Sequence, residues 1–186
     1  MITAVARHQF GFSEVTGVKR CGIKGTEAAA LLQQLGATVP VNPNRVASLT
    51  APYQGRCLRL GFNEFLLEQQ DGTDLIDAVC AALAANNGRH CLAQRCDTSL
   101  LLQGPQLYPA LREICAYDFE SPRARADETV MTLMAGISVT FIRESHGAAQ
   151  GLRLWCDPTL GQYLRECLSA LGAQSPANSS PSVTDH

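Results

Sequence analysis

The stretch Ser99–Cys115, SLLLQGPQLYPALREIC, joins an apolar run to a helical pattern through a glycine and a proline. The residues SLLLQ predict a buried strand, and the pattern that follows predicts a helix to about Ala116. A strand that turns on glycine into a helix is either a phosphate cradle or plain architecture. The difference decides whether the chain carries nucleotide chemistry.

Phosphate binding is not expected at this turn. A P-loop needs a second glycine followed by lysine and Ser or Thr, whereas Gly104 is followed by Pro105, which has no N–H to donate. The dinucleotide fingerprint G-x-G-x-x-G is also missing. We therefore expect a steric role, in which glycine permits the reversal and proline presets φ. Pro109 predicts a kink in the helix, or a helix that starts near Pro109.

A similar arrangement occurs earlier in the chain. IKGTEAAALLQQLG, residues 23–36, also leads from an apolar strand through Gly25 into an apolar helix. Thr26 is the expected N-cap and Gly36 the expected C′ residue. The helix would bury Ala28, Leu31, Leu32 and Leu35.

The remaining patterns repeat the order of strand, helix and strands. Strand pairs are expected at 56–60 with 64–68 and at 130–134 with 137–142, with further strands at 90–96 and 151–156 and an irregular connector at 37–44. Thr73 would open a second helix with Ile76, Val79, Cys80 and Leu83 on one face. Asp157 and Pro158 would open a last helix that buries Leu160, Leu164, Cys167, Leu168 and Leu171. We expect an α+β fold of two related α/β halves. Residues 1–172 would form a single domain divided at about 1–88 and 89–172, and residues 173–186 a disordered tail.

Composition narrows the classes of function. The 186 residues are 46% hydrophobic with a formal net charge of −2, which argues against an electrostatic nucleic-acid or membrane surface. The sequence shows no secretory signal pattern and no apolar window of about 18 residues, so a cytoplasmic location is expected.

Eight cysteines raise the question of metal binding or disulfides. Five lie in apolar strands or helix faces and should be buried hydrophobes: Cys57, Cys80, Cys115, Cys156 and Cys167. Cys91 and Cys96, beside His90, have a spacing compatible with zinc ligands, but no second ligand pair is evident. We expect no metal site.

The order of the motifs resembles the aminomethyltransferase superfamily, which includes the glycine-cleavage T-protein. The similarity is carried by Asp97-Thr98-Ser99, the strand, Gly104-Pro105 and a helix with Leu111. The chain looks most like one short branch, the γ subunits of heterotetrameric sarcosine oxidase. That branch is similar over about residues 15–171, in the segments RCGIKGTEAAALLQQLG, VPVNPN, LRLGFNEFLLE, AGISVTFI and WCDPTLGQYLRECL.

The resemblance implies a T-protein-like fold without the chemistry. Folate-using members carry two carboxylates just after the hairpin glycine, whereas this chain reads Gly136-Ile137-Ser138-Val139. A serine cannot stabilise a developing cation or act as a base at neutral pH. The Lys24-Gly25 pair also lacks the K-G-C-x-x-G-Q-E motif of the related folate-binding repair proteins. The residues carried over are structural ones: Gly25, Asp97, Ser99, Gly104, Pro105 and Gly136.

The resemblance also implies the enzyme complex to which the chain belongs. It suggests a non-catalytic γ subunit within a flavin-dependent complex that demethylates sarcosine to glycine, with tetrahydrofolate as one-carbon acceptor and oxygen as electron acceptor. The α, β and δ subunits would be the partners, and FAD, FMN, NAD, tetrahydrofolate and zinc would be held by other chains, none by this one. Dimethylglycine and N-methylglutamate remain alternative amines.

Several individual polar residues have two possible roles each. Asp97 is the most acid-like candidate, but its carboxylate is expected to bond backbone N–H groups such as that of Ser99. Glu64, Arg123 and Arg125 would either meet a larger subunit or face solvent. Trp155 is expected in the core.

Two other functions stay open at this stage. The first is a stand-alone tetrahydrofolate-binding protein of the T-protein type, against which the missing acids at Ser138 and Val139 count. The second is a cysteine-based zinc or redox protein.

Overall fold

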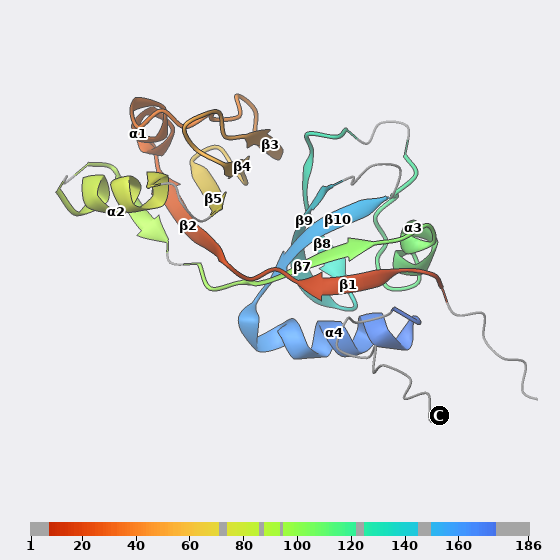
Figure 1. Ribbon diagram of the computed structural model, residues 1–186. Helices are drawn as coiled ribbons and strands as arrows, with labels where there is room; N and C mark the ends of the chain where they lie inside the picture. The colour runs from red at the N-terminus through yellow and green to blue at the C-terminus, as the bar shows by residue number, and fades with distance from the viewer. Residues whose placement is uncertain are drawn as a thin grey trace, which may run out of the picture. The chain divides into compact units, whose positions relative to one another are not determined.

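The computed structural model describes residues 8–70, 74–85, 88–93, 95–121, 125–144 and 150–173. In this part of the chain, two five-stranded antiparallel sheets are accompanied by short helices, which confirms the α+β class (Figure 1). The strands are β1 (Gly11–Glu14), β2 (Val18–Gly25), β3 (Arg45–Ser48), β4 (Gly55–Arg59), β5 (Glu64–Gln70), β6 (His90–Ala93), β7 (Thr98–Gln103), β8 (Thr129–Met134), β9 (Ile137–Arg143) and β10 (Gly151–Cys156). The helices are α1 (Ala28–Gln34), α2 (Leu75–Ala85), α3 (Leu107–Leu111), the 3₁₀ turn η1 (Pro158–Leu160) and α4 (Gly161–Ala170).

The chain divides into two compact units. Unit 1 takes its described residues from Met1–Val15, Thr98–Ala124 and Met131–His186, and unit 2 from Thr16–Asp97 and Arg125–Val130. Strand β6 pairs with β2, so unit 2 continues past residue 88 to Asp97 and also includes Arg125–Val130. That the two halves are related stays a prediction.

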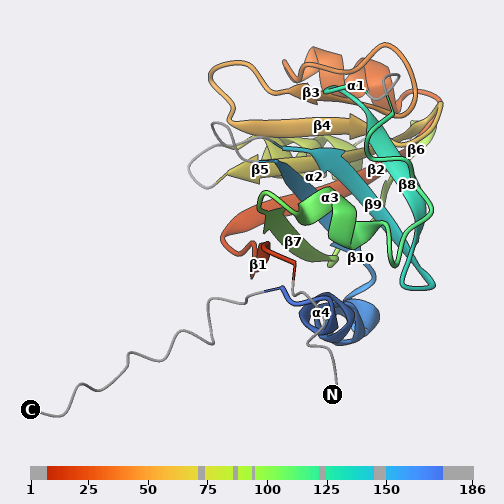
Figure 2. The same cartoon turned by 90° about the vertical axis from the view of Figure 1, so that its right-hand side faces the viewer.

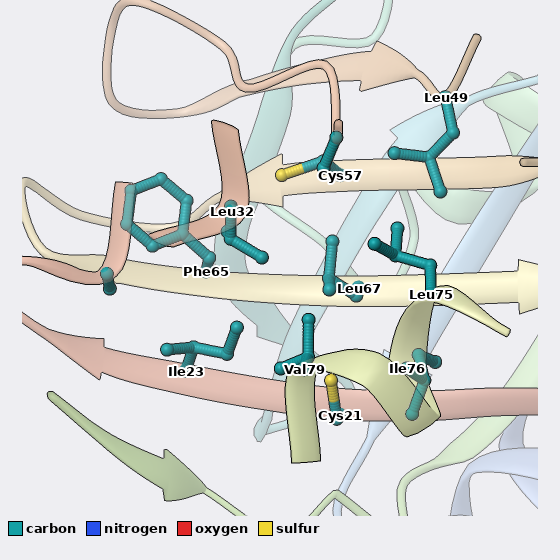
Figure 3. Packing of buried hydrophobic residues seen from close by; sticks show 12 residues of the cluster. Cys21, Ile23, Leu32, Leu49, Cys57, Phe65, Leu67, Leu75, Ile76 and Val79 are labelled. Carbon is teal, nitrogen blue, oxygen red and sulfur yellow. The ribbon is translucent and has the colours of Figure 1, made fainter. Parts of the chain in front are cut away.

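Unit 2 has the strand order β3-β4-β5-β2-β6. Helix α2 contacts β2, β5 and β6, and α1 contacts β2, so both helices pack against this sheet. Figure 3 shows side chains of the two helices lying among those of the strands. The fully buried members include Ile23, Leu32, Cys57, Leu67, Leu75 and Val79. The apolar helix faces predicted from the sequence thus form this core.

Unit 1 has the strand order β1-β7-β10-β9-β8, with every residue of β10 buried. Helix α4 lies beside this sheet near β1 and β7 (Figure 2), where Arg165 forms an ion pair with Glu14 at 3.8 Å. An aromatic group formed by Tyr108, Tyr117, Phe119 and Phe141 adds to the core, with ring centroids 5.1–5.6 Å apart. Trp155 is 1% exposed, which confirms its expected core position.

Both predicted hairpins are present. Strands β4 and β5 pair antiparallel around Gly61–Asn63, with Arg59 opposite Phe65. Strands β8 and β9 are neighbours joined at Ala135–Gly136, where both residues have positive φ, 51° and 81°. Two positive φ values are the signature of a tight turn whose twist matches that of the flanking strands.

Helix termini were predicted less well. The N-cap of α1 is Glu27 and makes no side-chain cap bond, so the expected Thr26 cap is wrong. Helix α3 ends at Leu111, not near Ala116, because turns follow and Cys115 bridges to Met134. Helix α3 begins at Leu107, which agrees with the expected alternative of a start near Pro109, and Pro109 stands in the first turn, where an N–H has no partner in the helix.

The last helix begins as expected and buries fewer residues than expected. The Asp157 carboxylate accepts a bond from the Thr159 N–H at 2.8 Å, which confirms the cap, but a 3₁₀ turn precedes α4. Leu164 and Leu168 are fully buried, whereas Leu160 is exposed because it lies in that turn. The expectations at Thr73 and for residues 174–186 lie outside the described residues.

The two glycine turns are places of close backbone approach. Gly104 has φ of +149°, and a Cβ added there would stand 2.5 Å from Phe10 Cα and 2.7 Å from Gln9 O. Gly25 has φ of +137°, and a Cβ there would collide with the backbone of Arg89 and His90. Only a residue without Cβ fits either position without strain.

We predict that Gly104→Ala lowers the free energy of unfolding by about 2–4 kcal/mol, because it adds a left-handed backbone cost to a backbone clash. Gly61→Ala is the matched control, since its Cβ would lie 3.8 Å from the nearest neighbour. Denaturant unfolding monitored by circular dichroism measures both. Equal stability of the two variants would contradict the close-approach role.

Candidate functional site

The space beside each glycine turn is filled by protein backbone. Residues 9 and 10 occupy the position next to Gly104, and residues 89 and 90 the position next to Gly25. Pro105 follows Gly104 and offers no N–H. Both glycine turns are therefore places where two backbone segments pack closely together.

The hairpin after Gly136 carries no acid at the positions where folate-using proteins of the resembled superfamily have them. Ser138 is exposed, and Val139 is 3% exposed on the buried side of β9. Gly136 faces open space, with nothing within 4 Å of an added Cβ. At these two positions the hairpin offers the Ser138 hydroxyl and no carboxylate.

Asp97 and Ser99 are held by partners other than those expected. The Asp97 carboxylate accepts a bond from Arg95 Nε at 2.8 Å, and its backbone carbonyl accepts one from Arg20 at 3.1 Å. Ser99 is 2% exposed, and its Oγ lies 3.4 Å from the Leu154 carbonyl. Asp97 is thus part of an ion pair and not a turn-shaping carboxylate bonded to Ser99.

A buried charge row crosses three strands of unit 2. Glu68 stands directly opposite Arg20 on one side and Arg56 on the other. Its carboxylate lies 2.9 Å from Arg20 Nε and 3.7 Å from Arg56 Nε, and its side chain is 4% exposed. Sequence reasoning missed this row, although strand register places the three residues side by side once β2, β4 and β5 are aligned. Its geometry is typical of structural ion pairing.

Glu64, Arg123 and Arg125 were expected to contact a partner or to face solvent, and the structure describes two of them. Glu64 forms an ion pair with Lys24, its cross-strand neighbour, at 3.0 Å. Arg125 is exposed and bonds Asp127 at 2.9 Å, and that hydrogen bond lowers the pKa of the Asp127 carboxyl. Arg123 lies outside the described residues.

The cysteines form no disulfide, and all eight lie in the described part of the chain. Burial raises the pKa of Cys21 to about 12, with a contribution from Cys80, and raises that of Cys57 to about 12. Cys91 and Cys96 are exposed. Among the described residues no group of three or more His, Cys, Asp or Glu is placed to hold a metal ion.

An exposed apolar pair is the most unusual surface feature. Val41 and Phe62 are 84% and 78% exposed, more than the other large exposed hydrophobic residues of the described chain. They stand on two different loops, before β3 and between β4 and β5. Single exposed hydrophobic residues are ordinary on protein surfaces, so neither residue marks a contact surface by itself.

Arg59 connects the two loops. Its guanidinium donates to the carbonyls of Val41 at 2.6 Å and Pro40 at 3.1 Å on one loop. On the other loop it donates to Phe62 at 2.7 Å and Gly61 at 3.3 Å. The planar fork suits this set of acceptors, which a lysine could not match.

No helix of the described residues is both long enough and apolar enough to cross a membrane. No protein-family model matches the sequence, and no curated protein matches it.

Solved structures do resemble this chain. One is a chain of the heterotetrameric sarcosine oxidase from Corynebacterium sp. U-96, solved in complex with pyrrole 2-carboxylate, with a TM-score of 0.70 and 22% identity over 91% of this chain and 89% of that chain. Another is the glycine cleavage system aminomethyltransferase T from Bartonella henselae, with a TM-score of 0.66 and 16% identity over 91% of this chain and 48% of that chain. The chain thus spans about half of the aminomethyltransferase. These likenesses confirm the T-protein-like fold.

We predict that Glu68→Ala lowers the free energy of unfolding by about 3–5 kcal/mol, because it leaves the guanidinium groups of Arg20 and Arg56 without their buried counter-charge. Glu64→Ala is the control on the same strand. Its ion pair is partly exposed and should contribute less than about 1 kcal/mol. Urea unfolding of both variants tests this, and a Glu68→Ala loss no larger than that of Glu64→Ala would refute it.

Thiol labelling should follow exposure. A thiol with a pKa of about 12 is roughly one part in ten thousand thiolate at pH 8, so Cys21 and Cys57 should stay unmodified in the native protein. Cys91 and Cys96 should react with iodoacetamide first. Peptide mass spectrometry reads out each site, with denatured protein as the control in which all eight react. Rapid native labelling of Cys57 would contradict the buried geometry.

Proposed function

We propose that this chain is a non-catalytic γ subunit of a heterotetrameric sarcosine oxidase and has a structural role in assembly of the complex. The observation that carries the proposal is the extent of the likeness: it covers 91% of this chain and 89% of a chain of such an oxidase. The likeness to aminomethyltransferase T covers 48% of that longer protein. A chain of this kind has the scaffold of one-carbon transfer in a shorter form.

The residues support a role without catalysis. The hairpin after Gly136 lacks both acids, and Asp97 is engaged by Arg95. The two glycine turns are closed by backbone. Under this proposal the α, β and δ subunits hold FAD, FMN, NAD, tetrahydrofolate and zinc, and the assembled enzyme works in the cytoplasm.

The reaction belongs to the complex as a whole. Sarcosine would be oxidised to glycine with its methyl carbon passed to tetrahydrofolate, while the flavins pass the electrons to oxygen. The subunit would contribute by packing against the larger chains. Contact with a larger chain would cover the exposed apolar side chains of Val41 and Phe62.

The test is affinity purification of the tagged chain from its native host, with the eluate scanned for flavin absorbance. We expect two large flavin-bearing chains to co-purify, and sarcosine-dependent oxygen uptake in the eluate. The preferred amine identifies the substrate.

Recovery of the chain without a flavoprotein would refute the proposal. Titration with tetrahydrofolate then distinguishes the alternative, a stand-alone folate-binding protein. The control is Ser138→Asp, which places an acid in the hairpin position. If the native chain bound folate without that acid, the argument from the hairpin would be wrong.

A further inference from the structure

We propose that β6 is a detachable edge strand of unit 2, and that the buried imidazole of His90 weakens its attachment to β2. This moving part is independent of the proposed function, since it follows from the contacts of the strand alone. Three features of β6 support it: an unpartnered buried side chain, an open outer side and little apolar burial along the strand.

The first residue of β6 has a buried polar side chain without a partner. The His90 side chain is 2% exposed, and in the described part of the chain neither of its ring nitrogens has a hydrogen-bond partner. The Glu27 carboxylate lies 4.0 Å from Nδ1, beyond hydrogen-bonding distance, and accepts a bond from the Arg89 N–H at 3.1 Å. A buried polar group without a partner costs free energy that is recovered when water reaches it. The closed position of β6 therefore carries a penalty that an opened strand does not.

The outer side of β6 is open. Among the described strands, β6 lies at an edge of its sheet and pairs with β2 alone, through its four residues. The other edge strand of unit 2, β3, is held on its outer side, because the Val46 N–H donates to the Asp127 carbonyl at 2.9 Å. No backbone bond of this kind joins the outer side of β6 to another described residue. Strand β6 can therefore leave the sheet by breaking one ladder.

Little apolar surface anchors the rest of β6. Cys91 is exposed, Leu92 is 46% exposed, and Ala93 has only a methyl group to bury. In β5, by contrast, the five residues from Phe65 to Gln69 are buried. Since each buried apolar side chain adds to the cost of opening, β6 should open at a lower cost than β5. Short segments with little burial are those that open locally in native proteins.

Opening of β6 would be local and would free one edge of β2. The backbone groups of Gly22–Gly25 that now pair with β6 would face solvent. The rest of the sheet would stay together, because β2 keeps its ladder with β5 from Val18 to Lys24.

Native-state hydrogen exchange of the full-length chain tests the proposal. Amide exchange in β6 and β5 is followed by NMR at urea concentrations below the unfolding transition, for the wild type, His90→Leu and His8→Leu. His90→Leu removes both ring nitrogens and keeps an apolar side chain of similar size. His8→Leu is the matched control, because that imidazole belongs to unit 1 and is paired with Glu113 at 2.6 Å.

We expect the β6 amides of the wild type to exchange faster than those of β5 and with little dependence on urea, because a local opening exposes little surface. His90→Leu should slow β6 exchange by about 5- to 150-fold, the factor that corresponds to removing a buried polar group without a partner. His8→Leu should leave β6 exchange at the wild-type rate. Should His90→Leu misfold, His90→Met makes the same comparison with a side chain that adapts to irregular gaps.

Two results would overturn the proposal. If β6 and β5 of the wild type exchange at the same rate and with the same urea dependence, β6 opens only when the whole unit unfolds. If folded His90 variants exchange their β6 amides at the wild-type rate, the imidazole does not weaken the strand.

Discussion

The fold depends on two places where one stretch of backbone lies directly against another. At Gly104 the neighbouring backbone is that of residues 9 and 10, and at Gly25 it is that of residues 89 and 90. Any side chain at either glycine would push these segments apart, and both lie at the end of a strand that leads into a helix. The backbone beside Gly104 leads directly into β1, and the backbone beside Gly25 leads into β6. The glycines thus fix the position of an edge strand in each sheet.

Local patterns in the sequence predicted those parts of the fold that local interactions control. Alternation and turn residues were enough for the two hairpins, and helical spacing was enough for the apolar faces of α1 and α2. Strands β1 and β3 escaped prediction, and each is only four residues long. Strand β1 pairs with β7 in the register Gly11 to Gln103, a relation that no local pattern records.

The polar residues were harder to place for the same reason. A carboxylate such as that of Asp97 has several potential donors within reach in the sequence, and the fold selects Arg95. The row of Arg20, Glu68 and Arg56 becomes visible only when three strands are aligned in register. Arg59 looked like an ordinary strand residue, yet its guanidinium joins two loops through their carbonyls. What the sequence did indicate correctly was the lack of acids after Gly136, since that is a matter of residue identity alone.

Unit 1 is built from separate segments of the chain, and this affects how it folds during synthesis on the ribosome. Unit 2 draws most of its residues from the continuous stretch Thr16–Asp97, whereas unit 1 needs three separate stretches. When β1 emerges, its partner β7 is still about ninety residues from being made, and β10 follows later still. In a nascent chain the first strand is therefore without its partner while unit 2 is being made, and the sheet of unit 1 forms only after β10 has been made. The order of the strands in the sequence therefore sets the order in which the two units fold.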